Sequence, residues 1–222
     1  MTIAMPRLQR VPAAERGITI ADFLVPIRLS ERIGVRVRHL TLVVAGALLI
    51  ALTANLYIHL PGNPVPITGQ TFSVLLVGGA LGFRRGIAAT ALYVVLGFWF
   101  PVYAERGQGI ETILGFGDGG IVLGATGGYI IGFVLAGALV GRLAELGWDR
   151  RIGGSVGAML IGNVVIYVIG LPWLMLATGQ TASWTIENGL VPFLFGDALK
   201  LALAAIAFPV AWWIVGRRPD ER

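Results

Sequence analysis

The sequence predicts an all-α protein that crosses a membrane six times and keeps both termini in the cytoplasm. Three observations support this prediction. The 222 residues are 56% hydrophobic and only 13% charged, with a mean hydropathy of +0.80, which is too apolar for a water-soluble domain. The apolar residues gather in six stretches. If the chain crosses the membrane at each stretch, almost all of the basic residues between and beyond the stretches fall on one side of the membrane.

The six apolar stretches are the predicted transmembrane helices. A helix needs about 20 residues to cross a hydrocarbon core of about 30 Å. The second and third stretches are shorter than this, so we expect them to extend into their flanks. Residues 1–39 are predicted to form a cytoplasmic or interfacial extension, and 217–222 a cytoplasmic tail. The membrane domain, 40–216, contains the stretches 40–60, 69–83, 86–100, 119–141, 152–175 and 189–216.

The distribution of basic residues sets the predicted orientation. With the N-terminus in the cytoplasm, 15 of the 17 Lys and Arg residues lie on the inner side, Arg106 lies outside and Lys200 lies within the sixth stretch. An excess of Lys and Arg in short cytoplasmic segments is the usual determinant of topology. The extension lacks the short apolar core and the cleavage site of a signal peptide. Its residues 18–30 either lie along the inner membrane surface or are disordered, because Pro26 limits any helix there.

Two of the predicted outer connections are rich in turn residues. The segment 61–70, PGNPVPITGQ, holds three prolines and two glycines, which predicts a shaped loop that enters the second helix near Thr68. The segment 115–120, GFGDGG, is also predicted to be irregular. These two connections indicate a mouth or a lid on the outer side.

Asp197 and Lys200 are the charges within the sixth stretch, and Lys200 is the only lysine in the chain. Residues three apart share one face of a helix. If Asn188 caps this helix, the two side chains lie about 14 Å and about 18 Å along its axis. A charge at the centre of a membrane helix costs about 2.5–3.5 kcal/mol, so the pair must face protein or a polar cavity. The pair is therefore either a structural ion pair or, as we expect, a ligand-binding pair in a cavity open to the outside.

Small residues suggest close helix packing at several places. In the fourth stretch, Gly132, Gly137 and Gly141 are expected to pack against a neighbouring helix. In the first stretch, Ala47 and Ala51 are four residues apart and could dock a helix of this chain or of a partner. The segment ATGGY differs, because adjacent glycines beside a hydroxyl group let a ligand approach the backbone. It contributes the candidate site residues Thr126, Gly127, Gly128 and Tyr129.

The sequence offers little for catalysis or metal binding. There is no cysteine, and the two histidines are separated, so no metal site is expected. A Walker A loop needs Gly-Lys-Ser/Thr, which the single lysine does not provide. The segment 153–157, GGSVG, matches the pattern around a hydrolase nucleophile. It lies beside two arginines at the inner start of the fifth stretch, so no catalytic residue is expected; an intramembrane hydrolase using Ser155 is the enzyme alternative.

Several motifs, taken together and in order, resemble the BioY family, the biotin-binding membrane subunits of energy-coupling factor (ECF) vitamin transporters. They are PVPITGQTFSVLLVGGALGFRRGIAATALYVVLGF, PVYA, LGATGGYIIGF, GLPWL and GLVPFLFGDALK, within about residues 64–200. The resemblance implies a six-helix subunit of the cell membrane that captures biotin from the outer side. It also implies a transmembrane coupling subunit and ATP-binding-cassette ATPases as partners. Biotin would be the transported ligand, with no resident cofactor.

The resemblance also implies roles for individual residues. By motif match, Asp197 and Lys200 contact the vitamin, and Ala47 and Ala51 dock the coupling subunit. Trp173 or Tyr129 could cover the apolar rings of biotin, and Gln70 falls within the PVPITGQ motif. The chain departs from the family pattern at Ala125, where proline is common, and at 98–100, FWF, where smaller residues are frequent. A capture subunit for another small vitamin is the alternative function.

Overall fold

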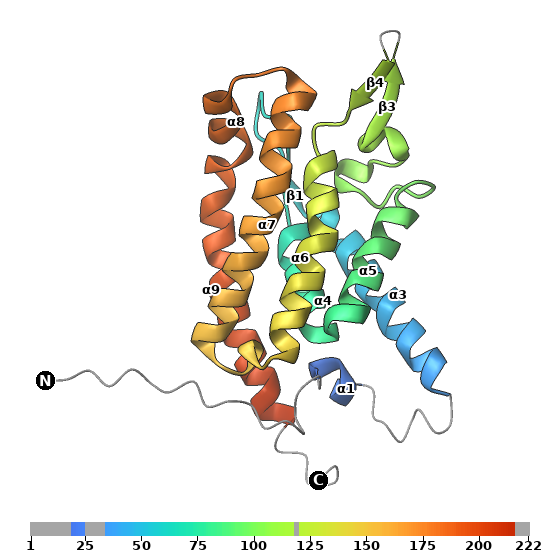
Figure 1. The fold of residues 1–222 in the computed structure, drawn as a ribbon, viewed down its shortest axis with the longest axis vertical. Helices are drawn as coiled ribbons and strands as arrows, with labels where there is room; N and C mark the ends of the chain where they lie inside the picture. Colours follow the sequence, from blue (N-terminus) through green and yellow to red (C-terminus); the bar gives the residue numbers. More distant parts are fainter. Residues whose placement is uncertain (1–18, 25–33, 118–119, 216–222) are drawn as a thin grey trace, which may run out of the picture.

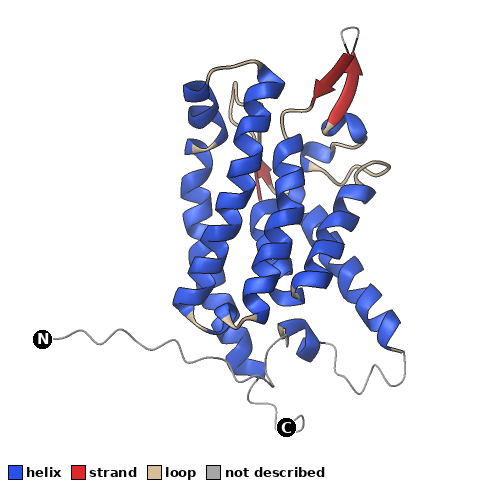
Figure 2. Ribbon diagram, viewed as in Figure 1, coloured by secondary structure: helices blue, strands red, loops and turns tan. Residues whose placement is uncertain are grey.

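Helices packed side by side form the body of the protein (Figure 1). The structure is a computed structural model that describes residues 19–24, 34–117 and 120–215. Figure 2 shows that helices dominate this part of the chain, with short β-hairpins towards one end. The helices of the body are α3 (Val35–Ala54), α4 (Gln70–Leu81), α5 (Phe83–Leu96), α6 (Gly127–Glu145), α7 (Ile152–Thr178) and α9 (Val191–Val215).

The remaining elements lie at the two ends of the helical body (Figure 1). At one end, named here the hairpin end, β1 (Tyr57–Ile58) pairs antiparallel with β2 (Ile67–Thr68), and β3 (Leu114–Gly117) pairs with β4 (Gly120–Leu123). The helix α8 (Ala182–Gly189) also lies there. The opposite end carries α1 (Ile20–Leu24) and the C-terminal part of α9, and is named the α1 end. The short 3-10 helices are η2 (Ala104–Arg106), η3 (Ile110–Thr112) and η4 (Trp148–Arg150).

Four helical segments of the described chain are long and apolar enough to cross a membrane. They are α3, α6, α7 and the continuous stretch Ala182–Ile214 that joins α8 to α9. The helices α4 and α5 have only 12 and 14 residues, or about 18 Å and 21 Å at 1.5 Å per residue. The expectation that they extend into their flanks is wrong for α4. The helix α5 does start before residue 86, at Phe83, but it ends at Leu96 and is also shorter than its predicted stretch. Gly82, whose φ of +81° is a conformation that glycine adopts readily, ends α4 and starts α5.

Two other predicted helix boundaries are also wrong. The fourth helix starts at Gly127 rather than near residue 119, because residues 120–123 pair with β3 as the second strand of a hairpin. The sixth helix starts at Val191, since Asn188 belongs to α8. Asp197 and Lys200 consequently lie about 9 Å and about 14 Å along α9, nearer to the hairpin end than predicted.

Glycines bring the backbones of the helices into contact. A Cβ atom on Gly78 of α4 would lie 2.4 Å from the carbonyl oxygen of Gly137 on α6. A Cβ on Gly141 would lie 2.5 Å from the backbone of Gly82, and one on Gly132 would lie 3.1 Å from Ile166 of α7. The packing roles expected for Gly132, Gly137 and Gly141 are thus confirmed, and α6 is the central helix of the body.

The helix α1 is packed onto the α1 end of the body. Ile20 and Ala21 are buried, and the Asp22 carboxylate accepts hydrogen bonds from Arg38 at 3.3 Å and Arg85 at 2.8 Å. Burial by itself raises the pKa of Asp22, but the hydrogen bond from Thr19 and the charge of Arg85 outweigh it and hold the pKa below its ordinary value. Residues 20–24 of the segment 18–30 are thus helical and packed against the body of the protein. Pro26 and its neighbours lie outside the described residues.

A buried carboxylate at the α1 end makes the stability depend on pH. Asp149 of η4 is 3% exposed, and one of its oxygens accepts from Trp212 Nε1 at 2.7 Å, while the other has no hydrogen-bond partner among the described residues. Burial raises the pKa of Asp149 to about 6, partly offset by the Trp212 bond and by Arg150. A raised acid pKa means that the folded state binds the proton more tightly than the unfolded state, so stability falls as pH rises from about 4 to about 6.

Replacing Asp149 with Asn is therefore expected to stabilise the protein at pH 7.5. The amide oxygen still accepts from Trp212, but no charge is buried. In detergent, each kcal/mol gained should raise the unfolding temperature by about 2–4 °C. The advantage over the unmodified protein should shrink as pH falls to about 5, which thermal unfolding at several pH values would measure. An equal difference at pH 5 and pH 7.5 would contradict the explanation.

Candidate ligand-binding site

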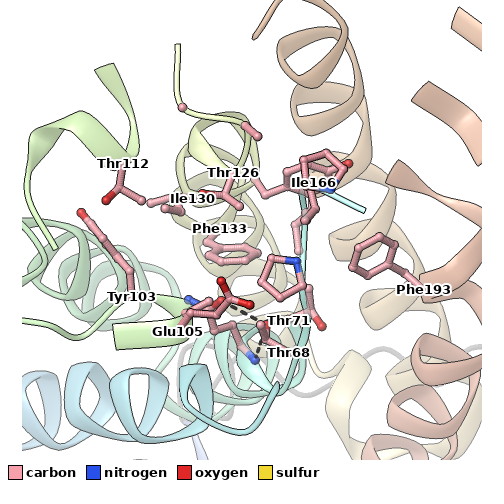
Figure 3. A pocket seen from close by; sticks show the side chains of 18 of the residues that line it. Thr68, Thr71, Tyr103, Glu105, Thr112, Thr126, Ile130, Phe133, Ile166 and Phe193 are labelled. Carbon is pink, nitrogen blue, oxygen red and sulfur yellow. Dashed lines mark hydrogen bonds between the residues drawn. The ribbon is translucent and has the colours of Figure 1, made fainter. Parts of the chain in front are cut away.

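A cavity of about 300 Å³ lies between the helices at the hairpin end. This volume is at the lower end of the range for small-molecule sites. Its walls come from α4, α6, α7 and α9, and two connections cover it: the segment between α3 and α4 through Pro64 to Pro66, and the segment between α5 and α6 through Tyr103 to Glu105. Figure 3 shows side chains from these segments converging on one space, among them Thr71, Phe133 and Phe193.

Lys200 contributes an ammonium group to the wall of the cavity. Its Nζ atom donates to Thr68 O at 3.0 Å, to Thr71 Oγ1 at 2.6 Å and to Asp197 Oδ1 at 3.3 Å. An ammonium group has three hydrogens, so all of them have protein acceptors. The side chain is 18% exposed. The group is thus held in place by two helices and the strand β2, and a ligand that reached it would share or replace one of these bonds.

Asp197 lies behind Lys200 and does not line the cavity. Its side chain is 6% exposed, and its second oxygen accepts a hydrogen bond from the Tyr167 hydroxyl group of α7. The predicted pairing of Asp197 with Lys200 on one face of the helix is present. Because Tyr167 and Lys200 both line the cavity, Asp197 positions the two polar groups that a ligand meets.

Aromatic side chains form the apolar part of the wall. Tyr129 is stacked on Phe193, with ring centroids 6.4 Å apart, and meets Tyr167 edge to face. Its hydroxyl group donates to the carbonyl oxygen of Gly189 at 2.9 Å, which joins α6 to α8. Phe133, one turn after Tyr129 on α6, extends the wall inward. Flat, rigid rings of this kind suit the faces of a small cyclic ligand.

The structure separates the predicted site residues into two groups. Lys200, Gln70, Thr126 and Tyr129 line the cavity. Gln70 is fixed there because its amide group donates to the Tyr93 hydroxyl group and accepts from Thr68. The residues that do not line the cavity are Asp197, Gly127, Gly128 and Trp173.

The two glycines of ATGGY pack against a neighbouring helix. A Cβ on Gly128 would lie 2.3 Å from Trp173 of α7, and one on Gly127 would lie 2.9 Å from the indole nitrogen. That nitrogen donates to the Gly124 carbonyl oxygen at 2.9 Å. The close approach to this backbone is therefore made by α7, and Trp173 fixes the start of α6 on which Thr126 and Tyr129 stand.

Some residues of the cavity were not predicted from the sequence. Tyr167 is thirty residues from Asp197, and no local pattern connects them. The prolines of 61–70 had indicated a shaped outer loop, and Pro64 and Pro66 do line the cavity. Glu105 and Thr112 come from a segment with few distinguishing features apart from its glycines. Phe193 could have been found, because it stands one turn before Asp197 on the same helix.

The other candidate residues lie elsewhere. Ala47 and Ala51 are 0% and 8% exposed. They are buried in the part of α3 that packs on α4 and α5, so in this structure neither is available to a helix of another chain. Ser155 is 1% exposed and donates to the carbonyl oxygen of Asp149 at 3.3 Å at the α1 end, away from the cavity. Among the described residues, no three His, Asp or Glu side chains are grouped as metal ligands.

The fold and the cavity define a class of protein. A bundle of apolar helices around a covered cavity, with a positioned ammonium group and an aromatic wall, is typical of a membrane protein that captures a small ligand. A family model described as the BioY family matches residues 28–217. The chain belongs to the BioY family.

Three relatives illustrate the similarity. The Biotin transporter BioY of Thermotoga maritima is 32% identical over 166 residues, which cover 74% of this chain and 91% of that protein. The Probable biotin transporter BioY of Pyrococcus horikoshii is 36% identical, covering 72% and 89%. The Biotin transporter BioY of Rhodobacter capsulatus is 32% identical, covering 82% and 96%.

A solved structure has the same fold. It is a crystal structure of the S-component for biotin from an ECF-type ABC transporter, with a TM-score of 0.68 and 24% sequence identity. The match covers 79% of this chain and 90% of the other. At this identity the comparison supports the fold alone.

Proposed function

We propose that this protein is a biotin-capture subunit that takes biotin into the cavity at the hairpin end and delivers it inward together with ATPase partners. The observation that carries the proposal is the cavity itself. In it, the group formed by Lys200, Asp197 and Tyr167 meets the aromatic wall of Tyr129 and Phe193. Membership of a family whose relatives are named biotin transporters supports the choice of ligand.

The chemistry of biotin fits this arrangement. Its ureido group has two N–H donors and one carbonyl oxygen, its thiolane ring is apolar, and its valerate chain ends in a carboxylate. The Lys200 ammonium group donates, and the Tyr167 hydroxyl oxygen can accept. Charge-assisted hydrogen bonds of this type are stronger than neutral ones. Because Asp197 balances the charge of Lys200, the group as a whole suits a neutral polar head, with the fused rings against Tyr129.

The distribution of arginines supports a membrane orientation with the cavity facing outward. The α1 end carries the arginines of the helix starts and of the α6–α7 connection, whereas Arg106 is at the hairpin end. By the positive-inside rule the α1 end is cytoplasmic. We infer six crossings in the cell membrane, with α4 and α5 as two short ones, and both termini in the cytoplasm. The arginines concerned are Arg36, Arg38, Arg84, Arg85, Arg142, Arg150 and Arg151.

The partners follow from what the chain lacks and from its family. It has no Walker A loop, so it does not hydrolyse ATP by that device. The structural neighbour is described as a component of an ECF-type ABC transporter. We therefore propose a transmembrane coupling subunit and ATP-binding-cassette ATPases as partners. If the coupling subunit docks on α3, we propose that it meets the exposed face, which includes Leu48 and Leu52, since Ala47 and Ala51 are covered.

Thermal stabilisation by vitamins tests the proposed ligand. A ligand that binds only the folded state stabilises it by about 2.7 kcal/mol when its concentration is 100 times Kd. In detergent, biotin at this excess should raise the unfolding temperature by several degrees, whereas thiamine and riboflavin should not. Stabilisation by one of the other vitamins and not by biotin would replace biotin as the ligand while keeping the capture function.

A further inference from the structure

Two side chains meet across the connections that cover the cavity. His59 Nδ1 lies 2.6 Å from Glu105 Oε1, although the two residues are 46 positions apart. His59 follows β1 in the segment between α3 and α4, and Glu105 is the central residue of η2 in the segment between α5 and α6. Within the described chain, this is the hydrogen bond that joins the first of these segments to the second.

Both segments form part of the cavity wall. The segment of His59 contributes Pro64, Val65 and Pro66, and the segment of Glu105 contributes Tyr103 and Glu105 itself. A bond between them therefore holds the two covers together at the mouth. An imidazole can donate from Nδ1 in its neutral and its protonated forms, so the contact does not require one protonation state.

The base of the second segment is fixed to the helical body. The Tyr103 ring packs onto Gly97, where a Cβ would lie 2.1 Å from the ring, and its hydroxyl group donates to Val94 O at 2.7 Å. Gly109 N donates to Gly97 O at 2.8 Å. Tyr103 is 1% exposed. Movement of this segment is thus restricted to the short turn between Tyr103 and Gly109.

The backbone of that turn is strained. Glu105 and Arg106 have φ values of 56° and 58°, in the left-handed region that non-glycine residues rarely occupy. Two such residues in succession persist only when surrounding contacts hold them. The hydrogen bond from His59 is a contact of this kind, because it binds the side chain of the first strained residue.

We propose that the His59–Glu105 pair holds the turn 104–107 closed over the cavity and thereby sets how fast a ligand enters and leaves. The proposal rests on the proposed function for the identity of the ligand, but the closure itself does not depend on biotin. His59 and Glu105 are positioning residues, since they act by keeping the cover in place. Their side chains are 49% and 40% exposed, so the pair is weak enough to open during each binding event.

Thiol labelling inside the cavity measures this closure without a ligand. The chain has no cysteine, so Thr126→Cys, which lies in the cavity wall, provides a single reactive thiol. In this background, His59→Ala or Glu105→Ala should speed labelling by a small maleimide roughly two- to fivefold, the range expected for an exposed ion pair. The double variant should label no faster than the faster single variant, because both changes remove the same contact.

A matched control and a second readout complete the test. Glu187→Gln removes another exposed carboxylate at the hairpin end, on α8, and should leave the labelling rate unchanged. With Thr126 intact, His59→Cys and Glu105→Cys can be joined by a short bis-methanethiosulfonate reagent, which forms a disulfide with each thiol and releases methanesulfinate. This cross-link should slow biotin release at least tenfold, and reduction of the disulfides should restore it. Unchanged labelling in both alanine variants, or normal release from the cross-linked protein, would overturn the proposal. If the alanine variants label faster but the protein does not bind biotin, biotin is rejected as the ligand and the proposed closure is retained.

Discussion

Replacing Lys200 with alanine is expected to weaken biotin binding at least about thirtyfold. The ammonium group is the cation that the described residues place in the cavity wall, and three acceptors hold it there. Losing a charged hydrogen-bonding partner in a desolvated site costs about 2–5 kcal/mol, and 1.4 kcal/mol corresponds to a factor of ten in affinity. Equilibrium binding of radiolabelled biotin to the purified variant measures the loss.

The Lys200→Ala replacement also removes the ion-pair partner of Asp197, so it is expected to change the stability of the fold as well as biotin binding. Asp197 is 4% exposed, and without Lys200 only the Tyr167 hydroxyl group would remain as its partner in the structure. An unpaired buried charge destabilises the fold by about 3–5 kcal/mol. The double variant Asp197→Asn/Lys200→Ala removes both charges, so it should recover thermal stability but not binding. Affinity equal to that of the unmodified protein in either variant would contradict the assignment of the site.

The sequence located the charged pair correctly because the cost of burying charge in a membrane is large and local. Two charges three residues apart in an apolar stretch have few stable arrangements, and the structure shows the expected contact. Which member of the pair faces the cavity was not predictable. That depends on Tyr167 and Thr71, which belong to other helices and are brought to Asp197 and Lys200 only by the packing of the bundle.

The helix boundaries show where hydropathy is insufficient. Residues 120–123 are apolar enough to belong to a membrane helix, yet they form β4, because pairing with β3 satisfies their backbone groups outside the helical body. Similarly, the sequence predicts that a ligand approaches the backbone of ATGGY, but the two glycines of this segment contact Trp173 of α7. Sequence could not show that Trp173 rather than a ligand occupies the space beside Gly128.

Replacing Gly78 with valine is expected to force α4 and α6 apart and to destabilise the bundle. Even the first added carbon would lie 2.4 Å from the Gly137 carbonyl oxygen, and that atom belongs to the backbone of α6 and cannot rotate away. The helices α4 and α6 would have to separate.

Overpacking of this kind costs about 1–3 kcal/mol or more, and each kcal/mol lowers the unfolding temperature by about 2–4 °C. Biotin binding should fall as well, because α4 and α6 carry Gln70 and Tyr129, which both line the cavity. Gly153→Ala is the matched control, since a Cβ at this position of α7 would contact nothing within 4 Å. Thermal unfolding in detergent compares the two variants, and equal unfolding temperatures would show that α4 and α6 do not depend on contact between their backbones.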